Sequence, residues 1–279
     1  MKRMKWLMVF AAIMVAATSC GTKKESPKTP KTLVLYYSQT SNTKTVAQAI
    51  AQQTGADIEE IVPVKPFDGD FQATIQRCNQ ERQQGTKTAI KPLKADVKKY
   101  DVIFIGYPIW FGTYAPPIAT FLEQVDLSGK KVVPFCTFGS GGLETSIKDL
   151  TAQQPKAQVQ AGYGVRAARL AAVPQEVDQF LKAGGYVKGE YTKLPEFSAA
   201  HAVSDAEKAI FTAAIGNYPM IQAEAKTVAQ RTIPGGVEYL FTAADKPRPG
   251  APQGPAPGQI QVYVTVLTGQ APEFTRVVR

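Results

Sequence analysis

Apolar segments recur along the first two thirds of the chain, and stretches with helical spacing of their apolar residues separate them. Strands are predicted at Leu33–Tyr37, Asp57–Val62, Asp101–Gly106, Lys131–Thr137 and Ala157–Tyr163, of which the first, third and fourth are largely apolar. An almost uninterrupted apolar run is typical of a strand that is covered on both faces. The alternation of strand and helix therefore predicts an α/β fold with a doubly wound, five-stranded parallel sheet over residues 31–185.

Residues 186–279 follow a different pattern, in which one helix precedes several strands. Ser204 and Glu207 form a capping box that predicts a helix reaching Ile215. Strands are predicted at Ile221–Thr232, Val237–Ala244, Gln259–Thr268 and Phe274–Val278, with the Pro/Gly-rich segment Lys246–Gly258 as a long hairpin loop. This arrangement is α+β, so we place a domain boundary near Ala183–Lys188, where two glycines follow a predicted helix.

The loop after the first strand has the composition of an anion site. It reads Ser38-Gln39-Thr40-Ser41-Asn42-Thr43 and leads directly into a helix in which Val46, Ala49 and Ile50 share a face. The unpaired N–H groups and the positive dipole end of a helix N-terminus face an anion, and four hydroxyls can donate beside them. The alternative is an ordinary strand-to-helix turn that is capped by a serine or threonine.

Two further loops follow predicted strands of the same sheet. Pro108-Ile109-Trp110-Phe111-Gly112 comes after the third strand, and Thr137-Phe138-Gly139-Ser140-Gly141-Gly142 ends the fourth. Because ligands of open α/β sheets bind at the carboxyl ends of the strands, we expect all three loops to converge there. Aromatic faces in the second loop offer stacking area, and glycines in the third let the backbone approach a ligand. Alternatively, the aromatic residues fill space beneath a helix that begins near Pro116.

The three loops together resemble the flavodoxin family. Its FMN phosphate loop is written T-G-N-T, and here Thr40-Ser41-Asn42-Thr43 reads T-S-N-T, with Gln39 and Ser41 where glycine is common. The resemblance implies the flavodoxin strand order 2-1-3-4-5 and FMN as cofactor. It also implies that the first loop holds the phosphate, that Trp110 stacks on the ring, and that the other two loops reach the ring edges.

Motifs for several other chemistries are absent. The loop at Gly139 is not a G-x-G-x-x-G turn, because Glu144 occupies the final glycine position, and neither a Walker motif nor a G-x-S-x-G elbow occurs. The single histidine, His201, is expected on a surface loop of the second domain. Cys136 is expected to be an inert buried thiol and Cys78 to lie on a helix, with a disulfide between them as the alternative. We therefore predict no catalytic residue and no metal ligand.

The first 19 residues have the composition of a signal peptide. A positive start is followed by the apolar run Trp6–Val15 and then by Ala17-Thr18-Ser19-Cys20. This resembles a bacterial lipoprotein signal, which implies that Cys20 is lipidated. A plain secretory signal that is cut near the same point is the alternative. Residues 20–30 then form a flexible tether, and the expected location is the bacterial cell envelope, lipid-anchored and facing the periplasm.

The second domain resembles a cystatin-like fold. Arg231-Thr232-Ile233-Pro234-Gly235 lies where cystatins carry a Q-x-V-x-G hairpin, but arginine replaces the glutamine. The tryptophan of the second cystatin hairpin has no counterpart either, since Trp6 and Trp110 are the only two in the chain. This part is therefore interpreted as a binding or docking module rather than a protease inhibitor.

These observations predict an FMN-binding electron-transfer protein that is tethered to a bacterial membrane. Its partners are then a redox protein or a small electron donor or acceptor, and the membrane through the lipid. The net charge of +9 forms no basic cluster in the sequence, so no nucleic acid partner is expected. The alternatives are an FMN-dependent quinone or NAD(P)H oxidoreductase, and a non-redox binding lipoprotein that has lost FMN.

Overall fold

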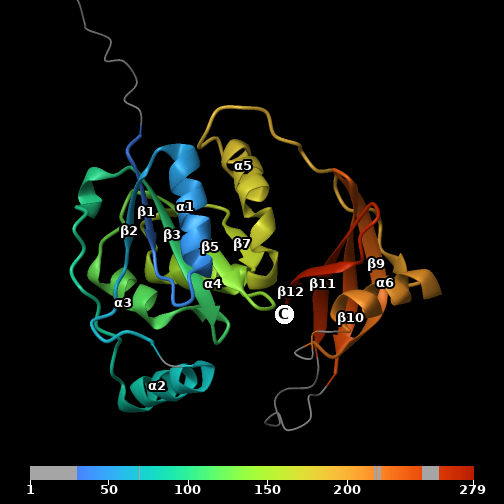
Figure 1. The fold of residues 1–279 in the computed structure, drawn as a ribbon, viewed down its shortest axis with the longest axis horizontal. Helices are drawn as coiled ribbons and strands as arrows, with labels where there is room; N and C mark the ends of the chain where they lie inside the picture. The colour runs from blue at the N-terminus through green and yellow to red at the C-terminus, as the bar shows by residue number, and fades with distance from the viewer. Residues whose placement is uncertain (1–29, 69, 217, 219–220, 247–257) are drawn as a thin grey trace, which may run out of the picture.

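The structure, a computed structural model, describes residues 30–68, 70–216, 218, 221–246 and 258–279. It contains one parallel and one antiparallel sheet, each with its own helices (Figure 1). Cys20 and the signal-like segment lie outside the described residues, as does most of the segment Lys246–Gly258. Within the described residues, no helix is long and apolar enough to cross a membrane.

The first sheet has the strand order β2-β1-β3-β5-β6, which confirms the predicted flavodoxin-like topology. Its strands are β1 (Thr32–Tyr36), β2 (Asp57–Glu60), β3 (Val102–Trp110), β5 (Lys131–Phe138), β6 (Gln158–Val159) and β7 (Tyr163–Arg166). All of them pair in parallel, and β7 continues beside β5 where β6 ends.

The last predicted strand, Ala157–Tyr163, is interrupted by a short gap between β6 and β7. Val132 of β5 accepts a hydrogen bond from the N–H of Gln160. Pro134 lies two residues after Val132 and faces the same neighbouring strand. Because it has no N–H, it cannot donate the next hydrogen bond of the ladder. The interruption therefore lies opposite this proline.

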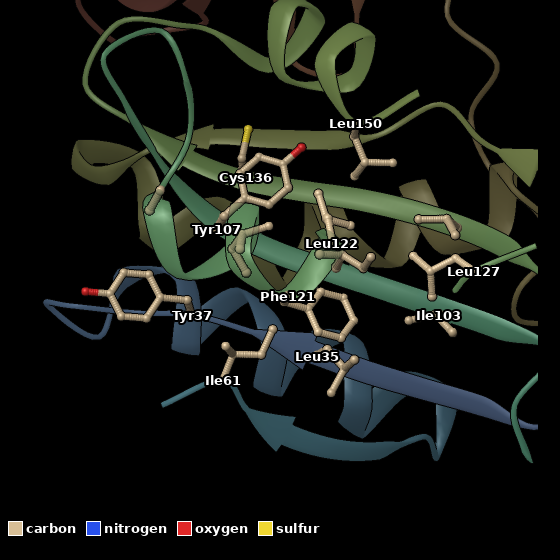
Figure 2. Close-up of a cluster of buried hydrophobic side chains, with 14 of the residues drawn as sticks. Leu35, Tyr37, Ile61, Ile103, Tyr107, Phe121, Leu122, Leu127, Cys136 and Leu150 are labelled. Carbon is tan, nitrogen blue, oxygen red and sulfur yellow. The ribbon is translucent and has the colours of Figure 1, made fainter. Parts of the chain in front are cut away.

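Alternate residues of each central strand pack on opposite faces of the sheet. Leu35, Ile105 and Cys136 belong to the core beneath α3 (Pro116–Gln124) and α4 (Leu143–Gln153), part of which is shown in Figure 2. The intervening residues, such as Phe104, pack with α1 (Asn42–Thr54) and α5 (Val173–Ala183) on the other face. Helices on both faces explain why these strands carry continuous apolar runs.

Helix α2 (Phe71–Gln84) carries Cys78, as predicted, and lies beyond the carboxyl ends of the strands (Figure 1). Asp70 caps it through the N–H of Ala73, at 2.8 Å. Short 3-10 helices occupy Val97–Lys99 and Ala167–Ala172. Cys78 on α2 and Cys136 on β5 are both buried free thiols, so the alternative of a disulfide between them is not realised.

The second sheet is antiparallel, in the order β12-β11-β10-β9-β8. Its elements are β8 (His201–Ala202), α6 (Asp205–Ile215), β9 (Ala223–Ile233), β10 (Gly236–Asp245), β11 (Gln259–Leu267) and β12 (Glu273–Val278). The predicted capping box of Ser204 and Glu207 is present at the start of α6. His201 is exposed, but it lies on a short strand that pairs with β9 rather than on a loop, and its ring bonds to Glu207.

Candidate functional site

The loop between β1 and α1 leaves the helix N-terminus open. The N-cap residue Ser41 forms no side-chain cap hydrogen bond with α1, and the first turn of the helix contains no acidic residue. The N–H of Lys44 donates to the hydroxyl of Ser38 at 3.2 Å, which folds the loop back on itself. The first N–H groups of a helix have no partner within the helix, so this end can accept an anion.

The two residues that replace glycine in this loop are accommodated differently. Gln39 turns away from the helix end and donates to the carbonyl of Phe67 at 3.1 Å and to the hydroxyl of Thr74 at 2.9 Å. Ser41 adopts a left-handed backbone conformation, with φ 66° and ψ −4°. That conformation favours glycine and is strained for serine. The loop therefore keeps a backbone shape that suits glycine while it carries two side chains.

Contacts between their residues show that the three loops converge at one edge of the sheet, as predicted. The hydroxyl oxygens of Thr43 and Thr137 lie 2.8 Å apart and are buried, which joins the first loop to the third. Pro108 of the second loop pairs with Thr137 in the sheet. Because two hydroxyls share one hydrogen bond, the second O–H of the pair remains available to donate.

The second loop is a β-hairpin rather than an irregular loop. Strand β3 continues to Trp110, beyond the predicted end at Gly106, and pairs with β4 (Thr113–Tyr114). Phe111 and Gly112 form the turn with φ values of 52° and 88°, the pattern of a type I′ turn. Positive φ is uncommon for a bulky residue, and the Phe111 side chain is 57% exposed. The hairpin thus holds a half-exposed aromatic ring beside the third loop, with the guanidinium of Arg82 over the ring at 5.3 Å.

Trp110 lies on the side of this hairpin toward α2 and α3, and its expected stacking on the ring stays a prediction. Its ring packs edge-on against Tyr37 at 5.7 Å and Phe67 at 5.1 Å. It lines a hollow of about 400 Å³ beside α2 and α3. Phe111 lines that hollow and also a larger one, of about 950 Å³, beside the third loop. Phe111 is therefore the aromatic residue of this hairpin that faces the third loop.

The glycines of the third loop make room for the protein itself. A Cβ atom on Gly141 would lie 2.1 Å from the carbonyl oxygen of Val277 in β12. A Cβ atom on Gly142 would lie 2.6 Å from the side chain of Ile109. The expectation that these glycines stay bare for a ligand is therefore incomplete, because at both positions the space is already taken by other parts of the chain.

The larger hollow is formed by both domains. Besides the predicted Ile109, Phe111, Phe138 and residues 139–142, its lining includes Phe71, Glu144, Tyr218, Val277, Val278 and Arg279. Sequence analysis missed these six residues and Thr145, which also lines the hollow. No motif marks them, and Val277 and Val278 belong to β12, more than a hundred residues further along the chain than the third loop. We call this space the shared hollow.

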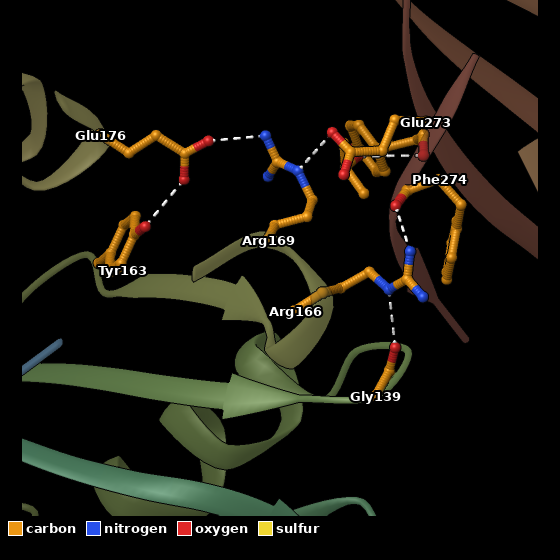
Figure 3. A network of polar contacts seen from close by, with 9 residues as sticks. Gly139, Tyr163, Arg166, Arg169, Glu176, Glu273 and Phe274 are labelled. Carbon is orange, nitrogen blue, oxygen red and sulfur yellow. Dashed lines mark hydrogen bonds and ion pairs between the residues drawn. The ribbon is translucent and has the colours of Figure 1, made fainter. Parts of the chain in front are cut away.

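Two arginines hold the second domain against the first, Arg166 at the end of β7 and Arg169 in the 3-10 helix that follows (Figure 3). Arg166 donates to the carbonyl oxygens of Gly139 at 2.9 Å and Phe274 at 2.6 Å. Arg169 binds Glu273 of β12 at 2.9 Å and Glu176 of α5 at 2.7 Å. Burial opposes the charge of Arg169, but the two carboxylates outweigh it and raise the pKa of this guanidinium. Arg166 thus connects the third loop directly to β12 of the second domain.

Comparison with known proteins agrees with the flavodoxin-like fold of the first domain. A family model described as Flavodoxin matches residues 31–173. An NAD(P)H dehydrogenase (quinone) from Paracoccus denitrificans is 34% identical over 133 residues, which are 42% of this chain and 59% of that protein. The chain therefore spans less than two thirds of the length of this curated relative.

Two solved structures cover about half of the chain. A protein from Bacteroides eggerthii, provisionally described as a flavoprotein, is 30% identical, with a TM-score of 0.50 over 57% of this chain and 100% of that one. A flavoprotein from Lactobacillus acidophilus, crystallised with FMN, is 28% identical, with a TM-score of 0.44 over 49% of this chain and 93% of that one. The family model alone covers just over half of the 279 residues, and the chain belongs to the flavodoxin family.

Proposed function

We propose that this chain binds FMN at the carboxyl edge of the first sheet and transfers electrons through it. The observation that carries the proposal is the open N-terminus of α1, surrounded by hydroxyls and free of acidic residues in its first turn. A phosphate group is one of the anions that such an end binds. Membership of the flavodoxin family supports FMN as its bearer.

One set of residues binds the phosphate end of the cofactor, and another contacts its ring. Ser38, Thr40, Ser41, Asn42 and Thr43 hold the phosphate together with the first N–H groups of α1. The hairpin at Phe111 and the loop at residues 137–142 bound the ring. FMN supplies the redox chemistry, and the protein binds it, orients it and sets the polarity around it.

The first experiment is to purify the chain from residue 21 to 279 and record its visible absorption spectrum. Yellow protein that releases FMN on denaturation is the expected result. Colourless protein that also rejects added FMN would contradict the proposal. It would favour the alternative of a binding lipoprotein without a flavin.

A pair of substitutions at Ser41 tests the phosphate assignment. Ser41→Asp places a negative charge at the helix end and should weaken FMN binding at least about tenfold, whereas binding of riboflavin, which has no phosphate, should change little. Ser41→Gly keeps the left-handed turn and is the matched control. Equal losses for FMN and riboflavin would show that this loop does not hold the phosphate.

A second candidate is an FMN-dependent reductase of quinones, supplied with electrons by NAD(P)H. The name of the Paracoccus denitrificans relative favours it, although the match covers only part of that protein. Steady-state oxidation of NADH or NADPH with a soluble quinone distinguishes the two. Turnover supports the reductase, and FMN binding without turnover supports the carrier.

We also propose that lipidated Cys20 tethers this redox domain to the envelope membrane. The sequence Ala17-Thr18-Ser19-Cys20 supports it, and residues 20–30 give the domain reach from the surface. Metabolic labelling with palmitate tests the anchor in a bacterial host. The native chain should carry label, and Cys20→Ala should not.

A further inference from the structure

The second domain approaches the flavodoxin-like domain through an edge strand. Strand β12 is the outermost strand of its sheet, so one of its edges has no neighbour within that sheet. The N–H of Val277 on this strand donates to the carbonyl oxygen of Ser140 at 2.7 Å. An unpaired strand edge attracts any backbone that can hydrogen-bond to it, and here the third loop takes that place.

Packing around this hydrogen bond places β12 close to the third loop. The carbonyl oxygen of Val277 lies so near Gly141 that no other residue fits there without displacement. Arg276 of β12 forms an ion pair with Glu144 of α4 at 3.4 Å. Arg166 lies over the rings of Tyr218 and Phe274, which themselves pack at 5.3 Å.

These contacts place the end of β12 in one hollow with exposed aromatic residues of the first domain. Phe71 and Phe111 of the first domain line the shared hollow together with Val278 and Arg279 of the second. Arg279 also reaches Asp245 of β10, at 3.6 Å. The hollow has a volume of about 950 Å³, at the upper end of the range for small-molecule sites.

We propose that β12 forms one side of the FMN ring site, so that the bound flavin is reached by small planar acceptors and not by a protein partner. The inference rests on the proposed FMN function. A protein partner would have to contact the exposed edge of the flavin ring and the protein surface around it. In this proposal the second domain covers that surface. A planar apolar acceptor such as a quinone matches a hollow that aromatic and aliphatic side chains line.

The electron balance defines two acceptors for the test. A quinone takes two electrons and two protons, one proton from the reduced flavin and one from water, and leaves as a quinol. Ferric cytochrome c takes one electron, so two molecules oxidise one reduced flavin. The flavin is reduced beforehand with an equivalent of dithionite, and the small acceptor is the naphthoquinone menadione.

The variants are Val278→Trp, which fills the hollow from the β12 side, and Val237→Trp as the control. Val237 is a partly buried residue of β10 and does not line the hollow. We expect Val278→Trp either to weaken FMN binding or to slow menadione reduction by about tenfold, because the added ring takes up space in the shared hollow. The control should stay within about twofold, and native protein should reduce menadione at least about tenfold faster than cytochrome c per electron.

Equal behaviour of the two variants in both measurements would overturn the inference, as would equal rates with menadione and cytochrome c. If Val278→Trp does not fold, Val278→Ala against Val237→Ala replaces the pair, and a change in FMN affinity or menadione KM confined to Val278→Ala is expected. Absence of FMN from the native protein would overturn the proposed function together with the inference. If the native protein binds FMN but reduces menadione and cytochrome c at equal rates, only the inference is overturned.

Discussion

The hydroxyls of Thr43 and Thr137 form a buried hydrogen bond of 2.8 Å, although 94 residues separate them in the chain. Thr43 stands in the first turn of α1 and Thr137 near the end of β5. The bond therefore ties the proposed phosphate loop to the loop that bounds the ring. Two otherwise mobile connections are held in one geometry before a ligand arrives, which reduces the entropic cost of binding.

Replacing either threonine by valine should lower stability and FMN affinity together. Each single substitution leaves a buried hydroxyl without its partner and should cost about 1–2 kcal/mol in the free energy of unfolding. The double substitution should cost less than the sum of the two, because it leaves no unpaired group. Urea denaturation of the four proteins measures this coupling, and exact additivity would show that the bond contributes nothing.

Relief of backbone strain at Ser41 should stabilise the apoprotein. Its φ of 66° costs serine about 1 kcal/mol that glycine avoids, so Ser41→Gly should raise the midpoint of urea denaturation slightly. Ser41→Val should lower it, because a β-branched residue is least tolerant of this conformation. A lower midpoint for the glycine variant than for the valine variant would contradict the assignment of strain to this residue.

Alanine at Gly141 should loosen the contact between the domains. The added Cβ would lie 2.1 Å from the carbonyl oxygen of Val277, so β12 must move, at a cost of about 1–3 kcal/mol. Gly258→Ala is the control, since its Cβ would meet nothing within 4 Å. Hydrogen exchange of the Val277 amide should accelerate in the first variant only. Unchanged exchange would mean that the contact with Ser140 does not protect this amide.

Stability should fall in strong alkali, as buried phenols ionise. Burial first, and the Glu60 carboxylate next, raise the pKa of Tyr36 from 10.0 to about 12. Burial likewise raises the pKa of Tyr114 to about 12. Because the folded-state pKa is the higher one, this stabilisation is complete below pH 10 and is lost as the pH rises through about 12.

Circular dichroism during an alkaline titration measures the transition. Tyr114→Phe removes one ionising phenol and should move the unfolding midpoint to higher pH, once its lower stability at neutral pH is taken into account. Tyr191→Phe, at a residue that is 46% exposed, is the control and should leave the midpoint unchanged. Equal midpoints for both variants would show that Tyr114 does not take part in the transition.

Most of the secondary structure could be predicted, because it depends on local periodicity. The helix predicted at Cys78 is present as α2, and the strand order is the one that the resemblance to the flavodoxin family implies. The hairpin at Phe111 was missed, because a phenylalanine with positive φ gives no turn signal. The gap opposite Pro134 was missed because it depends on which side of β5 faces the neighbouring strand.

Local patterns in the chain encode the layered sheet and the open end of α1, since periodic burial and a polar turn each involve a few neighbouring residues. Two other features depend on how the chain packs as a whole: which aromatic ring faces the third loop, and the contact of β12 with Gly141. The second of these relationships joins residues more than a hundred positions apart. Both rest on single hydrogen bonds and close approaches between surfaces, which no local pattern encodes.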